Sequence, residues 1–548
     1  MTYVYLFFPI FVKNNEQMKK LLFFVILLIS VVRLDAQNIG DQITIDSLIY
    51  KVTSISPAEC EVYRYTDSIT DITIPSTITN SETEFSVTKI GESAFYRCSS
   101  LRTIVIPNSI ISIGEDAFSF CSNMTSITFE ENSQLASIGD WAFLYAKNLT
   151  SIEIPDKITE IGKAVFYYCL SLTSVIIPNS VTKIEKLAFY GCSSLTSAVI
   201  PNSVTSIGSG AFNYCYSLSN IAIPSSVTNI GLSAFDNCHN ITNITVEEGN
   251  VVYDSRDNCN AIIETSTNTL ITACKSTIIP NSVIGIGSEA FSGCSNLTTI
   301  TIPNSITYIG ICAFSGCSSL KSVVFEESSQ LDSICGNAFS HSSITSIEIP
   351  NSTTYIGSMA FCGCLNLTSI EIPDNVTRIE SCTFLDCSNL TSVEIPSSVA
   401  SIGDWAFYRC SSLRTIKCHA ENIPETEKDA FEECPSDMTI YVPESSVESY
   451  KVATPWNYYE IIGFSPTFVS EVHNEDLNIY PNPVNDRLYI ETECVIKEIV
   501  VYDIYGRRQT IGNGEQSLDI DVSCLNSGIY FVKIKTNNGT ITKRFVKQ

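Results

Sequence analysis

Apolar and polar positions in the middle of the chain follow one recurring pattern. In residues 149–172, apolar side chains stand at Ile152 and Ile154 between polar neighbours, and Pro155 follows directly. This alternation predicts a short strand with both isoleucines pointing inward. The strand would end at the proline, because that residue has no N–H to continue a ladder. Phe166 then returns to the interior, and since one unit cannot bury these side chains alone, neighbouring units must stack.

The period of the pattern is read from an Ala-Phe pair and is 23 residues, as between Phe189 and Phe212. The same phase holds at Phe95, Phe118, Phe143, Phe166, Phe235, Phe291, Phe314, Phe339, Phe361, Phe384, Phe407 and Phe431. A period of this length predicts a repeat solenoid of about 14 coils over residues 88–435. The predicted core includes Phe189, Phe212, Phe235, Phe291, Phe314, Cys192, Cys215 and Cys238.

The repeat is interrupted once. Phe235 and Phe291 are 56 positions apart, which is one period plus 33. Alternating segments at 261–265 and 269–274 predict a hairpin inserted into a coil at about 247–278. Insertions of this kind map to one face of a solenoid.

The flanking segments predict two caps and a second module. Residues 37–87 alternate apolar and polar positions, as a β-rich N-terminal cap would. Residues 436–464 predict a C-terminal cap with one last strand and a short amphipathic helix at 445–456. After a linker at 465–473, short alternating strands divided by Gly, Asn and Asp predict a small Ig-like β-sandwich at 474–548.

The first residues predict an export signal. Two lysines follow Met18, then Leu21–Val32 is an apolar run interrupted only by Ser30, and Ala36 offers a small residue for cleavage. This order is typical of a secretory signal peptide, here residues 1–36 with Met18 as the true start. A run of twelve residues is too short to span a bilayer, so no transmembrane segment is expected in the mature chain. The alternative is an N-terminal membrane anchor built from this run and the apolar run before Met18.

The charge of the chain restricts its partners. Removing residues 1–36 takes away two acidic and four basic residues, which leaves 56 acidic against 28 basic residues. Nucleic acids and anionic membranes repel such a chain and are excluded as expected partners. The balance instead favours solubility and basic ligands.

The repeat text I-P-x-S-V-x-x-I-G-x-x-A-F-x-x-C resembles the BspA-like leucine-rich repeat family of bacterial surface proteins. The strand segment also has the L-x-x-L-x-L spacing of a leucine-rich repeat. Some units depart from the text, since Phe129-Glu130 and Phe325-Glu326 replace Ile-Pro. The resemblance implies a surface adhesin for host proteins or other cells.

The C-terminal module resembles the sorting domain of the type IX secretion system. The motifs that carry the resemblance are Tyr480–Pro483, Tyr502–Arg507, Leu525–Lys533 and Lys543–Lys547. Within them, the sorting-motif residues are Gly528, Tyr530, Lys533, Lys543 and Lys547. The resemblance implies the type IX secretion machinery as a partner, export through the periplasm and across an outer membrane, and then release or surface attachment. Asn526-Ser527 departs from the proline that often precedes the glycine, and the alternative is an ordinary adhesive sandwich domain.

The chain has 22 cysteines, and most of them form a column rather than a disulfide framework. Twelve lie three residues after the repeat phenylalanine, and Ala146 and Ser342 occupy the two remaining places. A column that accepts Cys, Ala or Ser predicts a small, buried and chemically inert residue. Neighbours about 5 Å apart with parallel side chains also suit disulfide geometry poorly. Outside the column, Cys259 and Cys274 flank the inserted hairpin and could form a disulfide.

The sequence offers no catalytic arrangement. The four histidines, at positions 239, 341, 419 and 473, lie in unrelated contexts, and no nucleophile, zinc-protease or phosphate-loop motif is present. The pair Cys362-Gly-Cys364 lacks the second ligand pair that a zinc site needs. We therefore expect no enzyme activity, no cofactor and no metal.

The outward positions of the strand segment carry the binding hypothesis. They are mostly Thr and Ser, with one variable position per coil that is apolar from Ile176 to Ala222 and acidic at Glu348, Glu371 and Glu394. Carboxylates stacked at strand spacing could meet an extended ligand rich in Lys or Arg. The alternative is that these glutamates result from divergence among the repeats and are merely exposed to solvent, with no role in binding. For the whole protein, the alternative to an adhesin is a passive structural spacer without a defined ligand.

Overall fold

The structure is a computed structural model that describes residues 38–464 and, in the C-terminal part, residues 477–482, 484–492, 495–503, 508–509, 518–526, 528–536 and 540–547. The chain divides into two compact units, the solenoid and the C-terminal module. The predicted signal peptide and the linker at 465–473 lie outside the described residues.

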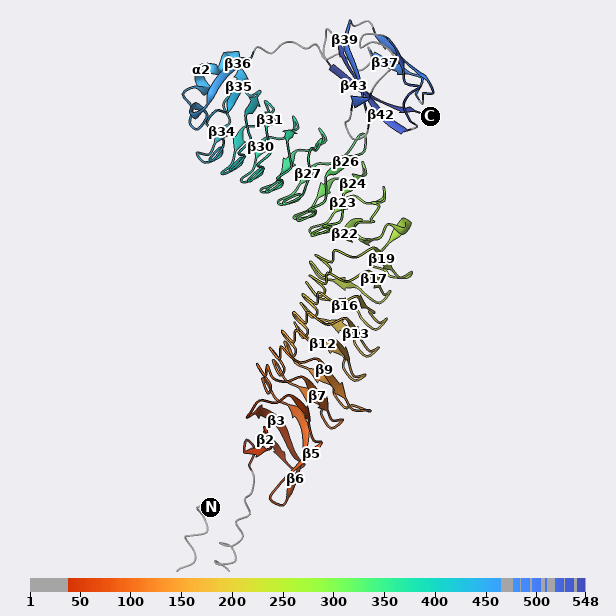
Figure 1. Ribbon diagram of the computed structural model, residues 1–548, viewed down its shortest axis with the longest axis vertical. Coiled ribbons are helices and arrows are strands. Elements are labelled where there is room, and N and C mark those ends of the chain that lie inside the picture. The colour runs from red at the N-terminus through yellow and green to blue at the C-terminus, as the bar shows by residue number, and fades with distance from the viewer. Residues whose placement is uncertain are drawn as a thin grey trace, which may run out of the picture. The chain divides into compact units, whose positions relative to one another are not determined.

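Each regular coil places one strand in each of two parallel ladders (Figure 1). On the first ladder, here called the strand face, Ile152 of one coil pairs with Val175 of the next, one 23-residue period later. The strands of this face are β4 (Asp71–Thr73), β7 (Thr103–Ile106), β9 (Ser126–Phe129), β11 (Ser151–Glu153), β13 (Ser174–Ile176), β15 (Ser197–Ala198), β17 (Asn220–Ile223), β19 (Asn243–Val246), β24 (Thr299–Ile302), β26 (Ser322–Phe325), β29 (Ser369–Glu371), β31 (Ser392–Ile395), β33 (Thr415–Cys418) and β35 (Thr439–Pro443). The predicted solenoid with its 23-residue period is confirmed.

The second ladder is built from two-residue strands that follow the Ile-Pro turn. Ile161 pairs there with Ile184, and both point into the core. The strands are β8 (Ser112–Ile113), β10 (Ser137–Ile138), β12 (Glu160–Ile161), β14 (Lys183–Ile184), β16 (Ser206–Ile207), β18 (Asn229–Ile230), β23 (Gly285–Ile286), β25 (Tyr308–Ile309), β27 (Ser333–Ile334), β28 (Tyr355–Ile356), β30 (Arg378–Ile379), β32 (Ser401–Ile402) and β34 (Glu425–Thr426).

Repeat phenylalanines stack through the core, ring upon ring. The ring centroids of Phe189 and Phe212 lie 5.1 Å apart, with 10° between the ring planes. This ladder runs from Phe95 to Phe235 and again from Phe291 to Phe431. The eight residues predicted for the core, namely Phe189, Phe212, Phe235, Phe291, Phe314, Cys192, Cys215 and Cys238, are all buried. Because each ring packs against the ring of the next coil, every coil needs the same buried residues, and the sequence motif is therefore repeated.

The cysteine column adds a hydrogen bond that a small residue alone would not supply. The Cys215 thiol donates to the Phe189 carbonyl of the preceding coil, with Sγ and O 3.3 Å apart. That carbonyl also accepts the backbone N–H of Cys192, so both of its lone pairs are used. The same contact recurs in most coils, at Cys121, Cys169, Cys192, Cys238, Cys317, Cys364, Cys387, Cys410 and Cys434.

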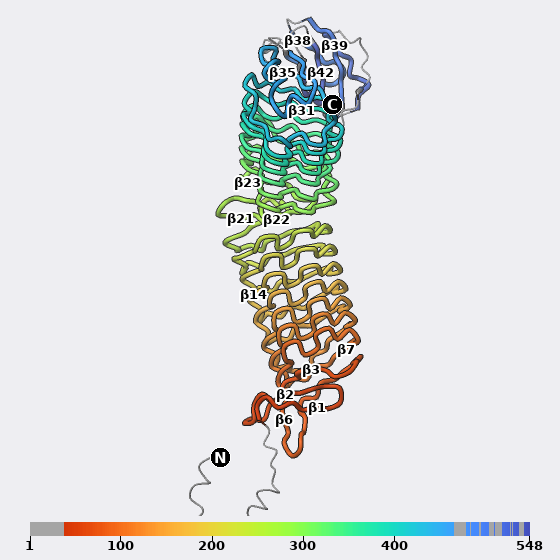
Figure 2. The backbone as a smooth tube through the Cα atoms, turned by 90° about the vertical axis from the view of Figure 1, so that its left-hand side faces the viewer, coloured from red at the N-terminus to blue at the C-terminus, as the bar shows by residue number. Residues whose placement is uncertain are grey.

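The insertion divides the core into two blocks. The N-terminal block runs from Ile43 to Tyr253, and the C-terminal block runs from Ile279 to Trp456. Between them, β21 (Ala261–Glu264) and β22 (Thr269–Ala273) form the predicted antiparallel hairpin, preceded by β20 (Tyr253–Asp254) and η1 (Arg256–Asn258). Figure 2 shows the regular stack of coils interrupted beside this hairpin.

The hairpin joins the blocks because its side chains alternate between them. Ile262 packs in the N-terminal block, whereas its neighbours Ala261 and Ile263 pack in the C-terminal block. The considered disulfide is not formed. Cys259 and Cys274 are free thiols, and they pack in different blocks.

Two caps close the solenoid. At the N-terminal end, β1 (Gln42–Ile45), β2 (Leu48–Ile55) and β3 (Ala58–Tyr65) form antiparallel neighbours, and β5 (Thr77–Asn80) pairs with β6 (Thr83–Ile90). The first strand-face strand, β4, already lies within the segment expected to be cap, since Ile74-Pro75 repeats the Ile-Pro of the coils.

The C-terminal cap contains less helix than the sequence predicts. Only α2 (Val447–Tyr450) is α-helical, between η2 (Glu444–Ser446) and η3 (Trp456–Tyr458), and β36 (Glu460–Phe464) follows. Pro455 disfavours helix at the residue before it, which limits the length of the element. Tyr450 and Trp456 are nonetheless fully buried and close the core.

The C-terminal module contains two antiparallel sheets that share one core. Strands β37 (Leu477–Tyr480), β38 (Arg487–Thr492) and β41 (Asp519–Asp521) form one sheet. Strands β39 (Ile496–Asp503), β40 (Arg508–Gln509), β42 (Gly528–Thr536) and β43 (Thr540–Lys547) form the other. Leu488 from the first sheet and Val532 from the second are both fully buried, as a small β-sandwich requires.

Candidate ligand-binding surface

Threonine hydroxyls at the position just before several strands of the strand face are engaged by the fold. Thr173 Oγ1 donates to the Thr150 carbonyl of the preceding coil at 3.0 Å, and Thr391 donates in the same way to Thr368 at 2.9 Å. Their protons are therefore used between coils, and each hydroxyl presents its lone pairs to solvent. These threonine hydroxyls therefore meet a ligand mainly as hydrogen-bond acceptors.

The acidic lane divides into exposed and paired carboxylates. Glu348 and Glu371 are exposed, and Glu371 lies beside Glu394 on the neighbouring strand. Glu394 is instead engaged, because its Oε1 lies 2.7 Å from Lys417 Nζ and 2.6 Å from His419 Nε2. These two partners hold the pKa of the Glu394 carboxyl below its usual value, although partial burial opposes them.

A shallow hollow of about 250 Å³ lies at this end of the strand face, lined by Glu371, Asp374, Glu394 and His419 among others. The sequence identified the glutamates but missed Lys417 and His419 as their partners. The strand alternation could have found Lys417, which occupies the variable position of the next coil. His419 could not be found in this way, since it stands where other coils have proline.

A second hollow, of about 770 Å³, lies over the apolar part of the strand face. Val199 and Ala222 line it, and the side chain of Val199 is 76% exposed. Ile176, one coil earlier on the same lane, is 62% exposed. A contiguous exposed apolar patch with a polar rim is typical of surfaces that bind other molecules.

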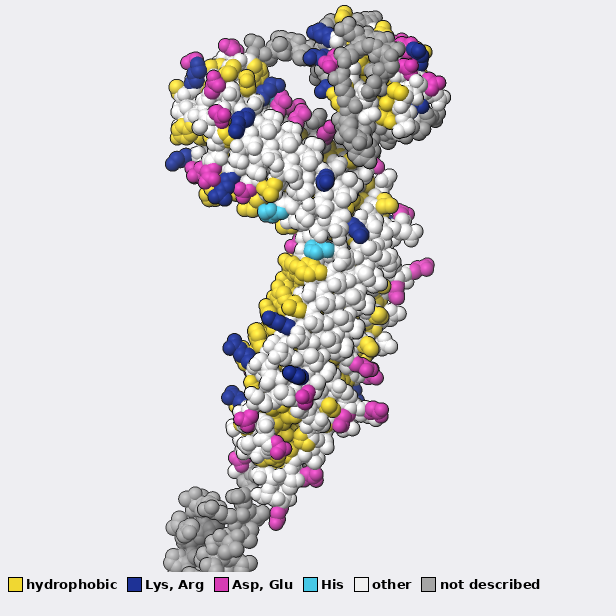
Figure 3. Space-filling view, in the orientation of Figure 1, with side chains coloured by type: hydrophobic (Ala, Val, Ile, Leu, Met, Phe, Trp, Pro, Cys, Tyr) yellow, Lys and Arg dark blue, Asp and Glu magenta, His cyan; other side chains and the backbone are white. Residues whose placement is uncertain are grey.

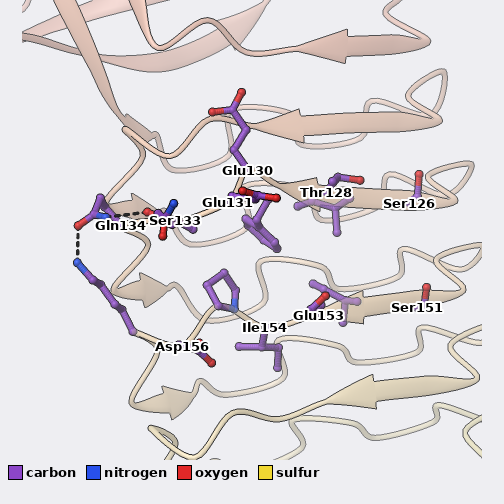
Figure 4. A pocket seen from close by; sticks show the side chains of 16 residues that line it. Ser126, Thr128, Glu130, Glu131, Ser133, Gln134, Ser151, Glu153, Ile154 and Asp156 are labelled. Atoms are coloured by element: carbon purple, nitrogen blue, oxygen red, sulfur yellow. Dashed lines mark hydrogen bonds between the residues drawn. The ribbon is translucent and has the colours of Figure 1, made fainter.

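A third hollow, of about 730 Å³, lies between the coils of β9 and β11 (Figure 4). Glu130, Glu131 and Glu153 line it, but Glu130 also accepts the backbone N–H of Asn108 at 3.1 Å. The same contact joins Glu247 to Ser225 and Glu326 to Asn304 in other coils. A glutamate that replaces the proline of Ile-Pro therefore has a structural role in each of these coils, Glu130 included.

The sorting-motif residues lie on the last two strands of the C-terminal module. Gly528, Tyr530 and Lys533 belong to β42, whereas Lys543 and Lys547 belong to β43. The ring of Tyr530 stacks on that of Phe545 at 5.7 Å, and Lys547 is largely buried.

The Tyr480–Pro483 motif is fixed to the last strand by one side chain. Asn482 Nδ2 donates to the Arg544 carbonyl at 3.1 Å, and Asn482 Oδ1 accepts the N–H of Val546 at 2.9 Å. The amide thus substitutes for a strand neighbour at this point, which explains an asparagine between two prolines. Residues 504–507 of the Tyr502–Arg507 motif lie outside the described residues.

Two absences concern the described parts of the chain. There, no group of three or more His, Cys, Asp or Glu side chains is arranged to hold a metal ion. Among the same residues, no helix has the length and apolar character needed to cross a membrane.

Comparison with protein families gives two matches. The model described as BspA type leucine rich repeat region matches residues 59–196, 159–267, 263–335 and 332–453. The model described as secretion system C-terminal sorting domain matches residues 478–548. A comparison with curated proteins gives no match.

Solved structures with the same fold include two bacterial proteins. A leucine rich cell surface protein from Faecalibacterium prausnitzii A2-165 is 27% identical, with a TM-score of 0.50 over 70% of this chain and 96% of that chain. The pneumococcal vaccine antigen PcpA is 21% identical, with a TM-score of 0.51 over 78% and 100%. The second likeness concerns the fold alone.

The matches agree with the architecture. The sorting domain directs the chain across the outer membrane to the cell surface or the medium and makes the type IX secretion machinery a partner. Because the repeat matches span most of the chain, the protein belongs to the BspA type leucine-rich repeat family of cell-surface proteins.

Proposed function

We propose that the protein is a non-enzymatic adhesin that binds a host protein or another cell through its strand face. The observation that carries the proposal is the exposure of Ile176 and Val199 at a lane that faces water. Each of these aliphatic side chains would gain roughly 1–2 kcal/mol of hydrophobic free energy if a partner covered it. The neighbouring hollow supplies the concave shape that such an anchor needs.

The acidic lane supports an extended partner with basic side chains. Glu348 and Glu371 are exposed one coil apart, at about the 5 Å spacing of paired strands. A Lys- or Arg-rich segment could meet both, and such contacts chiefly speed and orient encounter. Glu394 contributes less than its neighbours, because it already pairs with Lys417 and contacts His419.

The test uses an extended Lys-rich peptide as the probe and the mature chain as the binding protein. We expect the double variant Glu348→Lys/Glu371→Lys to lower the association rate about tenfold at low salt, with a smaller effect at high salt where charges are screened. The fold should be unaffected, since both side chains are exposed. The double variant Thr128→Lys/Thr301→Lys is the matched control on the same lane and should retain more of the wild-type rate.

The alternative function, a passive spacer, makes the opposite prediction. A spacer would show no saturable association with the probe, and the two double variants would behave alike. An unchanged rate and salt dependence in the Glu variant would also remove the acidic lane from the binding surface.

A further inference from the structure

Turns in the N-terminal block carry a second surface that the strand face does not include. Each turn follows a repeat phenylalanine, and together they present what we call the aromatic strip, made of Phe120, Tyr145, Tyr168, Tyr190, Tyr214 and Tyr216. Successive rings contact one another at centroid distances of 5.2, 5.1, 5.6, 5.2 and 5.8 Å. All six are exposed or half-buried. Figure 3 shows hydrophobic side chains gathered along this edge of the solenoid.

The turn does not need aromatic rings. In two coils of the C-terminal block the same two positions are Ser292-Gly293 and Ser315-Gly316, and other coils there carry different residue types. The second position requires a left-handed backbone, with φ of +67° at Gly293 but also +57° at Tyr145 and +55° at Tyr168. A side chain at this φ costs conformational free energy that glycine avoids. Phe120, Tyr145, Tyr168 and Tyr214 therefore carry a local cost that glycine would avoid, as His341, Asp386 and Arg409 also do in the C-terminal block.

The strip has a definite chemistry. The five turns that carry the strip contain no Asp or Glu, although the chain has 58 such residues. These turns are residues 119–123, 144–148, 167–171, 190–194 and 213–217. Burial, followed by neighbouring tyrosines, raises the pKa of Tyr190 and Tyr216, so their phenols stay protonated and can donate. The surface thus offers apolar ring area and hydroxyl groups, with cations at its N-terminal end, where Arg97 lies over the Phe120 ring and Lys147 over the Tyr145 ring.

We propose that the aromatic strip binds an extended neutral polysaccharide. Sugar rings have apolar C–H faces and a rim of hydroxyls, which match tyrosines that are apolar in body and polar at the tip. A ligand of repeating units also suits a surface that repeats with the coils, whereas a protein partner would present a different side chain at each step. Because the five turns carry no carboxylates, the ligand does not need positive charge to bind there. This inference does not rest on the proposed function, because it concerns another surface and another ligand.

The experiment is native gel electrophoresis of the mature chain with and without hydroxyethyl cellulose or galactomannan in the gel. We expect both neutral polysaccharides to retard the wild-type chain, with little change on adding salt. The double variant Tyr168→Gly/Tyr190→Ser copies the residues of the C-terminal turns and should fold normally. It should weaken retardation by about tenfold or more, as loss of central aromatic contacts does elsewhere.

Tyr355→Ala is the matched control, since Tyr355 is 44% exposed on β28 of the C-terminal block, and it should migrate like the wild type. If neither polysaccharide retards the wild-type chain, or if the double variant is retarded as strongly, the proposal is wrong. A strip that binds only protein would leave both mobilities unchanged and would overturn it as well. The readout is independent of the Lys-rich peptide, so the two surfaces can fail separately.

Discussion

Phe212 and Cys215 stand three residues apart in one coil and are both fully buried, yet they contribute differently. Phe212 stacks between Phe189 and Phe235, so its ring is part of a continuous ladder. Cys215 fills a small site and donates one weak hydrogen bond to the coil before it. The aromatic ring therefore supplies most of the packing at this level of the solenoid.

We predict that Phe212→Ala lowers the free energy of unfolding by about 3–5 kcal/mol, because it leaves a cavity between two rings. Neighbour coupling should spread the effect to adjacent coils. Cys215→Ala should cost only about 1 kcal/mol, the contribution of one hydrogen bond and a small volume. Urea unfolding of the mature chain measures both. If the two variants are equally unstable, the cysteine column has a larger role than a small buried donor.

Single residues show where sequence reasoning stops. Alternation along a strand was enough to place Ile152 in the core and Glu371 on the surface, because the backbone fixes both directions. The thiol bond of Cys215 and the pairing of Glu394 with His419 depend on positions in adjacent coils. A repeat pattern gives the coil spacing but not these side-chain orientations.

Among the elements, the joint between the two blocks has an unusual pair of carboxyl groups. Asp236 lies in the last turn of the N-terminal block and faces Glu289 of the first C-terminal coil. The carboxylate of Glu289 also accepts a hydrogen bond from Ser233 Oγ. Burial, and then the charge of Glu289, raise the pKa of Asp236 to about 8. The thiols of Cys238, Cys294 and Cys312 lie near Asp236, and burial raises their pKa values too. On the next turn, the His239 ring contacts the Gly293 carbonyl.

The sign of the pH effect follows from this shift. Between the ordinary pKa of 3.8 and about 8, folded Asp236 binds more protons than unfolded Asp236. Its contribution to stability is therefore largest at low pH and is lost as pH rises through that window. We predict that Asp236→Asn reduces the loss of stability between pH 5 and pH 8.

Urea midpoints at pH 5 and pH 8 test this prediction. Glu160→Gln, at an exposed position of the N-terminal block, is the control and should keep the wild-type pH dependence. An Asp236→Asn chain whose midpoint falls as much as that of the wild type would exclude the joint as the source.

The elements themselves were predictable to different degrees. The inserted hairpin was predicted because its strands alternate within the sequence, and its pairing is local. The cap helix was overestimated, since Val447 and Tyr450 have helical spacing but the helix ends at Tyr450, and Trp456 lies in the separate η3 that follows Pro455. The division of the core into two blocks was not predicted, because it depends on which side of the hairpin each residue faces.

At the scale of the whole molecule, the two units have separate roles. The solenoid closes its own core with Tyr450 and Trp456, and the C-terminal module has a core of its own. The module carries the sorting signal, whereas the proposed ligand surfaces lie on the solenoid. The sequence indicated this division through the change of pattern after residue 464. The ligand could not be read from it, because exposed positions are not constrained by packing.

The central claim is that the solenoid is a binding protein displayed outside the cell. Intact cells that make the full chain or a chain without residues 474–548 are incubated with the fluorescent Lys-rich peptide. We predict saturable capture by cells with the full chain, reduced capture with Glu348→Lys/Glu371→Lys, and background capture with the truncated chain, which should stay folded in the periplasm. Equal capture by cells with the truncated chain, or no capture by any of them, would contradict the account.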